Sequence, residues 1–282
     1  MAISINRLFG KDLSLDKACM APNLPYDESS QPYFGLLTRE PDNAQAWYRH
    51  GQAKYAAKDY VGALSSFLTA YYFSRSDKVV LFWAGLALDK LNRYREALKC
   101  FYAAKRYVDR NVLSNNIAVC YAKLGDYRAA IKLLKRITKQ RNSQSSTAFS
   151  NLGFIFLRLG QYHRAIDSFQ QGLKLDPSDA TLLMAMGVAY EAMHNDSMAD
   201  QWYLRALELN PTLQEALKGR VRCLLGLKRA SQALDYINAM LKQDQSDPEG
   251  WWLKGLCHDS LGEYRSAVNC YNHALTLRAR TR

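Results

Sequence analysis

The chain has 282 residues, of which 48% are hydrophobic and 23% charged, and this ordinary globular composition supports a continuous core. No apolar run reaches the roughly 18 residues that cross a bilayer, which argues against a transmembrane protein. The formal net charge of +12 predicts attraction to an acidic protein, a nucleic acid or an anionic lipid. Net charge alone does not distinguish among these three classes of partner.

We expect residues 1–31 to be extended or loosely ordered, since Pro22 and Pro25 prevent a helix across residues 20–31. This segment also lacks the apolar stretch and cleavage site of a secretory signal. Residues 32–43 then place Tyr33, Leu36 and Pro41 where the end of a repeat unit would have them. We therefore expect a capping half-repeat over 32–43, with a helix covering the first pair.

From residue 44 onward, small residues recur with a period near 34. The first set is Gly51, Gly85, Ala118, Gly153, Gly187, Val221 and Gly255, and the second is Ala63, Ala97, Ala130, Ala165, Ala199, Ala233 and Ala267. Both sets show the same separations. They predict seven units covering 44–281, namely 44–77, 78–110, 111–145, 146–179, 180–213, 214–247 and 248–281.

Within each unit, apolar residues three and four apart lie on both sides of a short polar break, which predicts two amphipathic helices joined by a tight turn. The small residues let two antiparallel helices approach closely. Large residues that fill the space toward the next pair are Phe67, Phe101, Leu134, Phe169, Tyr203, Ile237 and Tyr271. Pro177 and Pro211 fall between units, where a helix must stop.

The chain resembles the tetratricopeptide repeat family, most clearly in the stretches AWYRHGQAKYAAKDYVGALSSFLTA and SNLGFIFLRLGQYHRAIDSFQQGLKLDP. Unit 214–247 departs most, with Val221 in place of the glycine and Ala230 in place of the tyrosine. The resemblance implies an all-α fold, a right-handed superhelical solenoid of antiparallel helix pairs. It also implies a concave groove lined by the first helix of each pair.

The resemblance places groove-facing side chains just before the small residue, and one and four or five positions after it. The candidate groove residues are Tyr48, Arg49, Gln52, Tyr55, Phe82, Trp83, Lys90, Asn115, Asn116, Lys123, Asn151, Arg158, Met184, Lys218, Arg222 and Trp252, and the same face includes Val188, Glu191, Leu225 and Asp259. Trp83 and Trp252 are the candidate aromatic anchors for a partner.

Two polar features of this set each have a second interpretation. Asn116 and Asn151 share one register, where an amide could pair with the backbone of an extended peptide, or could be a solvated surface residue. Lys90, Lys123 and Arg158 form a positive line suited to carboxylates or phosphates. They could instead complement the helix dipole.

The sequence predicts no enzyme, cofactor or metal site. It contains no H-E-x-x-H, G-x-x-x-x-G-K-[ST], G-x-S-x-G or G-x-G-x-x-G motif. His50 and His258 replace apolar core positions, which is typical of a packed histidine. The six cysteines form no C-x-x-C pair, which favours a reducing cytoplasm. Five of them hold matching repeat positions, Cys100 with Cys270 and Cys120 with Cys223 and Cys257, which favours packing.

The preferred function is a cytoplasmic, non-enzymatic scaffold or adaptor that binds an extended or helical segment of a partner protein. An acidic partner protein is one option. Tyr48 and Gln52 replace the Lys and Asn that related heat-shock-chaperone adaptors use to hold a carboxylate. The alternatives are a bacterial secretion or assembly chaperone, and RNA or anionic-membrane binding through the basic outer face.

The basic run 132–146 lacks the interleaved aromatics that stack bases, which argues against nucleic acid. Homo-oligomerisation through the termini, and occupation of the groove by residues 1–31, are left open.

Overall fold

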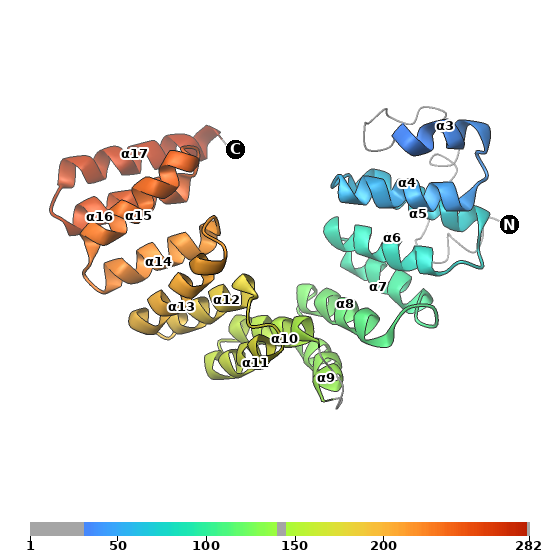
Figure 1. The fold of residues 1–282 in the computed structure, drawn as a ribbon, viewed down its shortest axis with the longest axis horizontal. Coiled ribbons are helices and arrows are strands. Elements are labelled where there is room, and N and C mark those ends of the chain that lie inside the picture. Colours follow the sequence, from blue (N-terminus) through green and yellow to red (C-terminus); the bar gives the residue numbers. More distant parts are fainter. Residues whose placement is uncertain (1–30, 140–144, 281–282) are drawn as a thin grey trace. The chain divides into compact units, whose positions relative to one another are not determined.

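The computed structural model describes residues 31–139 and 145–280, and all regular structure in these ranges is α-helical. The chain divides into two compact units, residues 1–140 and residues 141–282. Unit 1 contains α3 (Gln31–Arg39), α4 (Ala44–Ala56), α5 (Tyr60–Phe73), α6 (Val79–Lys90), α7 (Tyr94–Ala103), α8 (Arg110–Lys123) and α9 (Tyr127–Thr138) (Figure 1). Unit 2 contains α10 (Ser146–Arg158), α11 (Tyr162–Leu175), α12 (Ala180–Ala192), α13 (Asp196–Leu209), α14 (Gln214–Gly226), α15 (Ala230–Gln243), α16 (Pro248–Ser260) and α17 (Tyr264–Arg280). The predicted all-α array of helix pairs is confirmed.

Each helix pair lies within one of the seven predicted ranges, except that α8 begins one residue early. Asp109 caps α8, and its Oδ1 accepts hydrogen bonds from the backbone N–H groups of Asn111 at 2.8 Å and Val112 at 3.0 Å. Before the first pair, α3 packs against α4 and buries Leu37 to 4% exposure. The expected loose segment 1–31 lies outside the described residues, apart from Gln31, which begins α3.

Every pair turns on one residue in the left-handed backbone region, seven positions after the small residue of its first helix. These residues are Lys58, Asn92, Gly125, Gly160, His194, Lys228 and Gly262. In each turn the next backbone N–H donates to the carbonyl five residues earlier, as Asp59 does to Lys54 at 2.9 Å. This Schellman bond satisfies a carbonyl that the helix end leaves free, so one backbone conformation sets each hairpin.

The small residue of each first helix is matched by a large residue 16 positions later in the second helix of the same pair. A glycine faces a ring in five pairs, Gly51 with Phe67, Gly85 with Phe101, Gly153 with Phe169, Gly187 with Tyr203 and Gly255 with Tyr271, whereas Ala118 is matched by Leu134 and Val221 by Ile237. A Cβ on Gly153 would lie 2.4 Å from a ring carbon of the fully buried Phe169. The ring therefore occupies the volume that a larger first residue would need.

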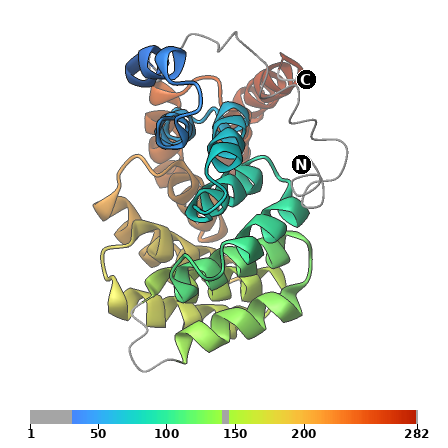
Figure 2. The same ribbon diagram turned by 90° about the vertical axis from the view of Figure 1, so that its right-hand side faces the viewer.

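Within each unit, first helices neighbour one another, as α4 and α6 do in unit 1 and α12, α14 and α16 do in unit 2 (Figure 1, Figure 2). Their shared surface positions form what we call the first-helix face of that unit. In unit 1 it comprises Tyr48, Gln52, Tyr55, Phe82, Trp83, Leu86, Asp89, Asn115 and Val119, and in unit 2 Ser150, Phe154, Met184, Val188, Glu191, Lys218, Arg222, Leu225, Trp252, Leu256 and Asp259.

Candidate functional site

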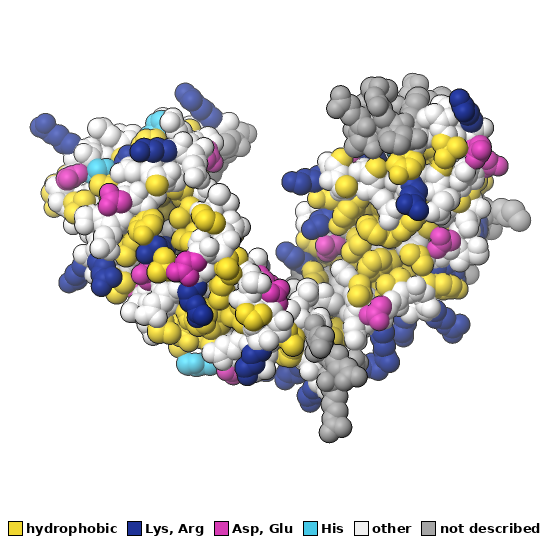
Figure 3. Space-filling model, viewed as in Figure 1, with side chains coloured by type: hydrophobic (Ala, Val, Ile, Leu, Met, Phe, Trp, Pro, Cys, Tyr) yellow, Lys and Arg dark blue, Asp and Glu magenta, His cyan; other side chains and the backbone are white. Residues whose placement is uncertain are grey.

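An aromatic cluster on the first-helix face of unit 1 consists of Tyr48, Tyr55 and Trp83, and it packs on Phe67 of the second helix α5. The Trp83 ring lies 6.4 Å from Tyr48, 5.9 Å from Tyr55 and 6.0 Å from Phe67, measured between centroids. Phe67 is fully buried, whereas the other three rings are half-buried. Hydrophobic side chains gather over α4 and α6 (Figure 3). The cluster therefore offers apolar surface whose position is fixed by a core ring.

Polar groups border this aromatic cluster. The Gln52 amide donates to the Tyr48 hydroxyl at 3.0 Å, and Arg49 on the same helix is exposed. Burial raises the pKa of the Tyr48 and Tyr55 phenols, so both remain neutral donors at physiological pH. Phe82 is half-buried, with its ring 5.7 Å from that of Phe101.

The positive line predicted from sequence lies at the ends of first helices. Lys90, Lys123 and Arg158 each stand in the last turn of their helix, and all are exposed. Beside the two lysines of unit 1, Asp89 is half-buried and accepts from Cys120 Sγ at 3.8 Å. Burial raises the pKa of Asp89, against the opposing fields of Lys90 and Lys123. The positions of these three cations suit both contact with an anionic group of a partner and stabilisation of the negative end of the helix dipole.

The two asparagines proposed to clamp a peptide lie in different units. Asn116 is half-buried on α8, where its amide donates to the Val112 carbonyl of its own helix at 2.9 Å. Asn115 beside it and Asn151 on α10 are also half-buried. The joint action of Asn116 and Asn151 on one peptide stays a prediction.

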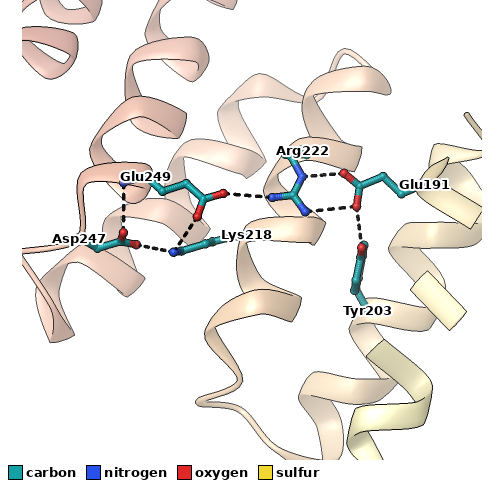
Figure 4. A network of polar contacts seen from close by, with 6 residues as sticks. All are labelled: Glu191, Tyr203, Lys218, Arg222, Asp247 and Glu249. Atoms are coloured by element: carbon teal, nitrogen blue, oxygen red, sulfur yellow. Dashed lines mark hydrogen bonds and ion pairs between the residues drawn. The ribbon is translucent and has the colours of Figure 1, made fainter. Parts of the chain in front are cut away.

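An ion network crosses the first-helix face of unit 2 and joins three consecutive repeats (Figure 4). The network consists of Glu191 from α12, Tyr203 from α13, Lys218 and Arg222 from α14, Asp247 before α16 and Glu249 from α16. Arg222 Nε lies 2.6 Å from Glu191, and its Nη1 lies 3.5 Å from Glu249. Lys218 Nζ lies 2.9 Å from Asp247 and 3.0 Å from Glu249.

Burial and charge hold this network in one protonation state. Burial alone would lower the pKa of Lys218, but hydrogen bonds to Asp247 and Glu249 outweigh it and raise that pKa. The Tyr203 hydroxyl donates to Glu191 at 2.5 Å, and burial together with this carboxylate raises its pKa. Lys218 and Arg222, both predicted to contact a partner, are thus already paired within unit 2.

The other predicted residues of unit 2 surround the network. Trp252 is 39% exposed, and its ring lies 4.7 Å from that of Tyr271. Met184 is half-buried, and Val188 on the same helix is 38% exposed. The first-helix face of unit 2 therefore combines apolar surface with two cations that three carboxylates already neutralise.

Sequence reasoning missed Asp89, Asp247 and Glu249. Asp89 holds the same register as Glu191, four positions after its glycine, which could have drawn attention to it. Asp247 and Glu249 stand at the start of α16, and Asp247 also accepts from the Glu249 backbone N–H at 3.1 Å. Glu249 follows Lys218 by 31 residues, slightly less than one repeat, which is the signal for contact between neighbouring pairs.

The described residues also bear on chemistry. Within residues 31–139 and 145–280, no three His, Cys, Asp or Glu side chains gather to hold a metal ion. Burial raises the pKa of the Cys100 and Cys120 thiols to about 12, which suits packing and disfavours a nucleophile. His50 is 2% exposed and pairs with Ser66 Oγ at 2.8 Å, which confirms it as a packed core histidine. None of the helices that the structure describes has both the length and the apolar character of a membrane span.

Comparison with protein families identifies the repeat. Three family models described as tetratricopeptide repeat match this chain, one at residues 109–178, one at residues 29–78 and 151–214, and one at residues 248–281. Together the matches cover more than half of the chain.

Several curated proteins are similar to parts of the chain. Superkiller complex protein 3 of Mus musculus is 25% identical over 84% of this chain and 18% of its own length. Tetratricopeptide repeat protein 8 of Mus musculus is 36% identical over 36% of this chain and 19% of its own length. A repeat-containing protein of Methanocaldococcus jannaschii is 22% identical over 89% of this chain and 41% of its own length. The chain spans less than half the length of each.

Solved structures share the fold at low sequence identity. The Cut9–Hcn1 hetero-tetramer of APC/C has a TM-score of 0.67 at 14% identity, covering 90% of this chain and 50% of that chain. A repeat protein from Parabacteroides merdae has a TM-score of 0.60 at 16% identity, covering 88% of this chain and 93% of that chain. A MamA structure has a TM-score of 0.54 at 19% identity, covering 62% of this chain and 98% of that chain.

Proposed function

Because this chain belongs to the tetratricopeptide repeat family, we propose that it is a non-enzymatic scaffold that binds a segment of a partner protein on its first-helix faces. Stacked helix pairs build an extended surface of this kind, and each face is set by a rigid core beneath it. The proposed partner segment is extended or helical, because either form presents side chains in a row along the helices.

The aromatic cluster of unit 1 carries this proposal. Tyr48, Tyr55 and Trp83 are half-buried and leave apolar surface next to hydroxyl and amide groups. Tyr48 and Trp83 pack on the core ring Phe67, and Tyr55 packs on Trp83. Half-buried aromatics on a rigid base are the residues that dominate protein interfaces, because little side-chain entropy is lost when they are covered.

An acidic stretch in the partner would find cations beside this cluster. Arg49, Lys90 and Lys123 are exposed on the first helices of unit 1. In unit 2, Lys218 and Arg222 are neutralised by the ion network, so there we assign partner contact to Met184, Val188 and Trp252. We place the proposed function in the cytoplasm, since the five described cysteines are free thiols.

Peptide display on the full chain tests the proposal. Peptides are first selected from a random library on the unaltered chain. Their affinity is then compared between this chain and the variant Tyr55→Ala/Phe82→Ala, which lacks two rings of the first-helix face. We expect affinity to fall about tenfold, the loss typical of interface aromatics. Tyr264→Ala is the matched control, because Tyr264 is 68% exposed but lies on the second helix α17. Its affinity should be unchanged.

Two results would contradict the proposal. One is a selection that yields no peptide tighter than about 100 µM, since an interface of standard size should support micromolar binding. The other is equal binding by the double variant while circular dichroism shows its helices intact. The same selections, repeated with Asn116→Ala/Asn151→Ala, check whether both amides act on one peptide.

A further inference from the structure

Most of the positive charge of the chain lies in residues 93–139 of unit 1. Residues 93–139 contain 12 Lys and Arg but 3 Asp and Glu, a net charge of +9 within a chain total of +12. Residues 145–280 contain 14 of each sign and are neutral. An uneven distribution of this size creates a local field that the total charge alone does not reveal.

The three acidic residues of this region are already engaged. Glu96 forms a two-point ion pair with Arg93, with both N–O distances at 2.7 Å. Asp109 caps α8, and Asp126 caps α9 by accepting from the Ala129 backbone N–H at 3.0 Å. These carboxylates therefore leave the neighbouring cations unneutralised.

Nine of the remaining cations share one surface, which we call the outer basic face; Arg110 and Lys123 lie apart from it on the first helix α8. This face consists of Arg95, Lys99, Lys105 and Arg106 on and after α7, and Arg128, Lys132, Lys135, Arg136 and Lys139 on and after α9, all exposed. In the part of the chain that the structure describes, none of the nine forms an ion pair. Arg95 and Arg128, like Lys99 and Lys132, hold equivalent positions one repeat apart, so they point to the same side.

The composition of this face distinguishes among polyanions. Five of its nine cations are lysines, a residue that protein–protein interfaces avoid and nucleic-acid interfaces favour. The described face of α9 exposes no large apolar side chain that could enter a bilayer. The α7 end instead adds two half-exposed tyrosines, Tyr102 at 48% and Tyr107 at 49%.

We propose that the outer basic face of unit 1 binds single-stranded nucleic acid, with the lysines and arginines on phosphates and the tyrosine rings under bases. A basic surface beside accessible aromatic rings is the arrangement that holds single strands without reading their sequence. The run 132–146 alone contains no ring, but the fold adds the tyrosines of the preceding repeat. This surface is separate from the first-helix face.

Fluorescence anisotropy with an oligouridylate of about 20 nucleotides tests the proposal on the full chain, across about 50 to about 300 mM salt. We expect a log–log salt slope near −3, which corresponds to four or five phosphates at about 0.7 per phosphate. The face variant replaces four cations by glutamine, Lys99→Gln, Lys132→Gln, Lys135→Gln and Arg136→Gln. Its affinity should fall at least about tenfold, with a slope flatter by about 2 to 3.

The matched control removes the same charge from neutral unit 2, through Lys174→Gln, Arg229→Gln, Lys242→Gln and Arg265→Gln, all at exposed positions. It should bind within about twofold of the unaltered chain, because residues 145–280 carry no net charge and so add little attraction for a polyanion. Equal weakening by both variants would reduce the effect to net charge and overturn the proposal. Absence of oligouridylate binding at about 50 mM salt would overturn it as well.

The tyrosines decide between a single strand and other polyanions. Tyr102→Ala/Tyr107→Ala should weaken oligouridylate about fivefold or more while leaving a duplex of equal length unaffected, and the corresponding Phe variants should retain binding. Equal weakening of duplex binding would refute the single-strand assignment. Competition by polyglutamate as strong as that by oligouridylate, charge for charge, would assign the face to an acidic protein instead. Tighter binding to anionic vesicles would assign it to a membrane.

Discussion

Replacing Gly153 by alanine should destabilise unit 2, although alanine is the better helix former. In a helix interior, alanine is favoured over glycine by about 1 kcal/mol. Against this, the new methyl would meet three ring carbons of Phe169 at 2.4, 2.6 and 2.9 Å. Phe169 is fully buried and cannot swing aside, so overpacking costs about 2–3 kcal/mol. The net expectation is a loss of about 1–2 kcal/mol.

The partner residue makes the sign of this effect testable. Where Ala118 replaces the glycine, position 134 holds leucine instead of a ring. In a Phe169→Leu background the clash is relieved, and Gly153→Ala should become neutral or stabilising by up to about 1 kcal/mol. The double-mutant cycle should thus show a coupling of about 2 kcal/mol.

Hydrogen exchange of the amides in α10 and α11 is the appropriate assay, because repeat arrays need not unfold in one step. Urea unfolding followed at 222 nm supplies the global comparison. Stabilisation by Gly153→Ala in the unaltered background, or the same sign in both backgrounds, would refute the packing argument.

Three further predictions concern buried polar groups. Lys218→Met should cost about 2–3 kcal/mol in urea unfolding because it removes the cation that pairs with the half-buried Asp247. Adding Asp247→Asn, which keeps the helix cap, should restore part of the loss, and a change below about 0.5 kcal/mol on Lys218→Met would contradict this. Because burial raises the folded-state pKa of Asp89, its ionisation opposes folding, and stability falls as pH rises from the unfolded pKa through the folded one. Asp89→Asn should therefore raise the thermal midpoint at pH 7, with an advantage that shrinks toward pH 4, and no change with pH would count against it. Finally, a Cys19→Ser chain should resist a disulfide-exchange reagent at pH 8 until urea is added, because the other five thiols are buried; rapid labelling without urea would contradict their burial.

The sequence specifies the repeat because the same steric requirement recurs every 34 residues. A close helix contact needs a small residue, and both Gly153 and its match Phe169 can be identified from their spacing in the sequence. The cap α3 was equally predictable, since its apolar residues hold the register of a repeat end.

The ion network was not predictable, because it depends on side-chain reach between neighbouring pairs. The sequence predicts that Lys218 and Arg222 are available to a partner. In the structure they form ion pairs with Glu191, Asp247 and Glu249 from neighbouring helix pairs. Periodicity finds which positions share a face, and it does not reveal which charges on that face already neutralise one another.

The left-handed turn residues leave room to engineer a sturdier scaffold. Glycine fills three of the seven turns, whereas Lys58, Asn92, His194 and Lys228 hold the same backbone at a steric cost of about 1 kcal/mol each. Glycine at these positions would relieve the backbone strain, but it would also raise the conformational entropy of the unfolded chain. The net gain in the free energy of unfolding should be about 0.5 kcal/mol per turn. Since the turns lie at hairpin tips, such changes would add heat resistance while leaving the helix faces as they are.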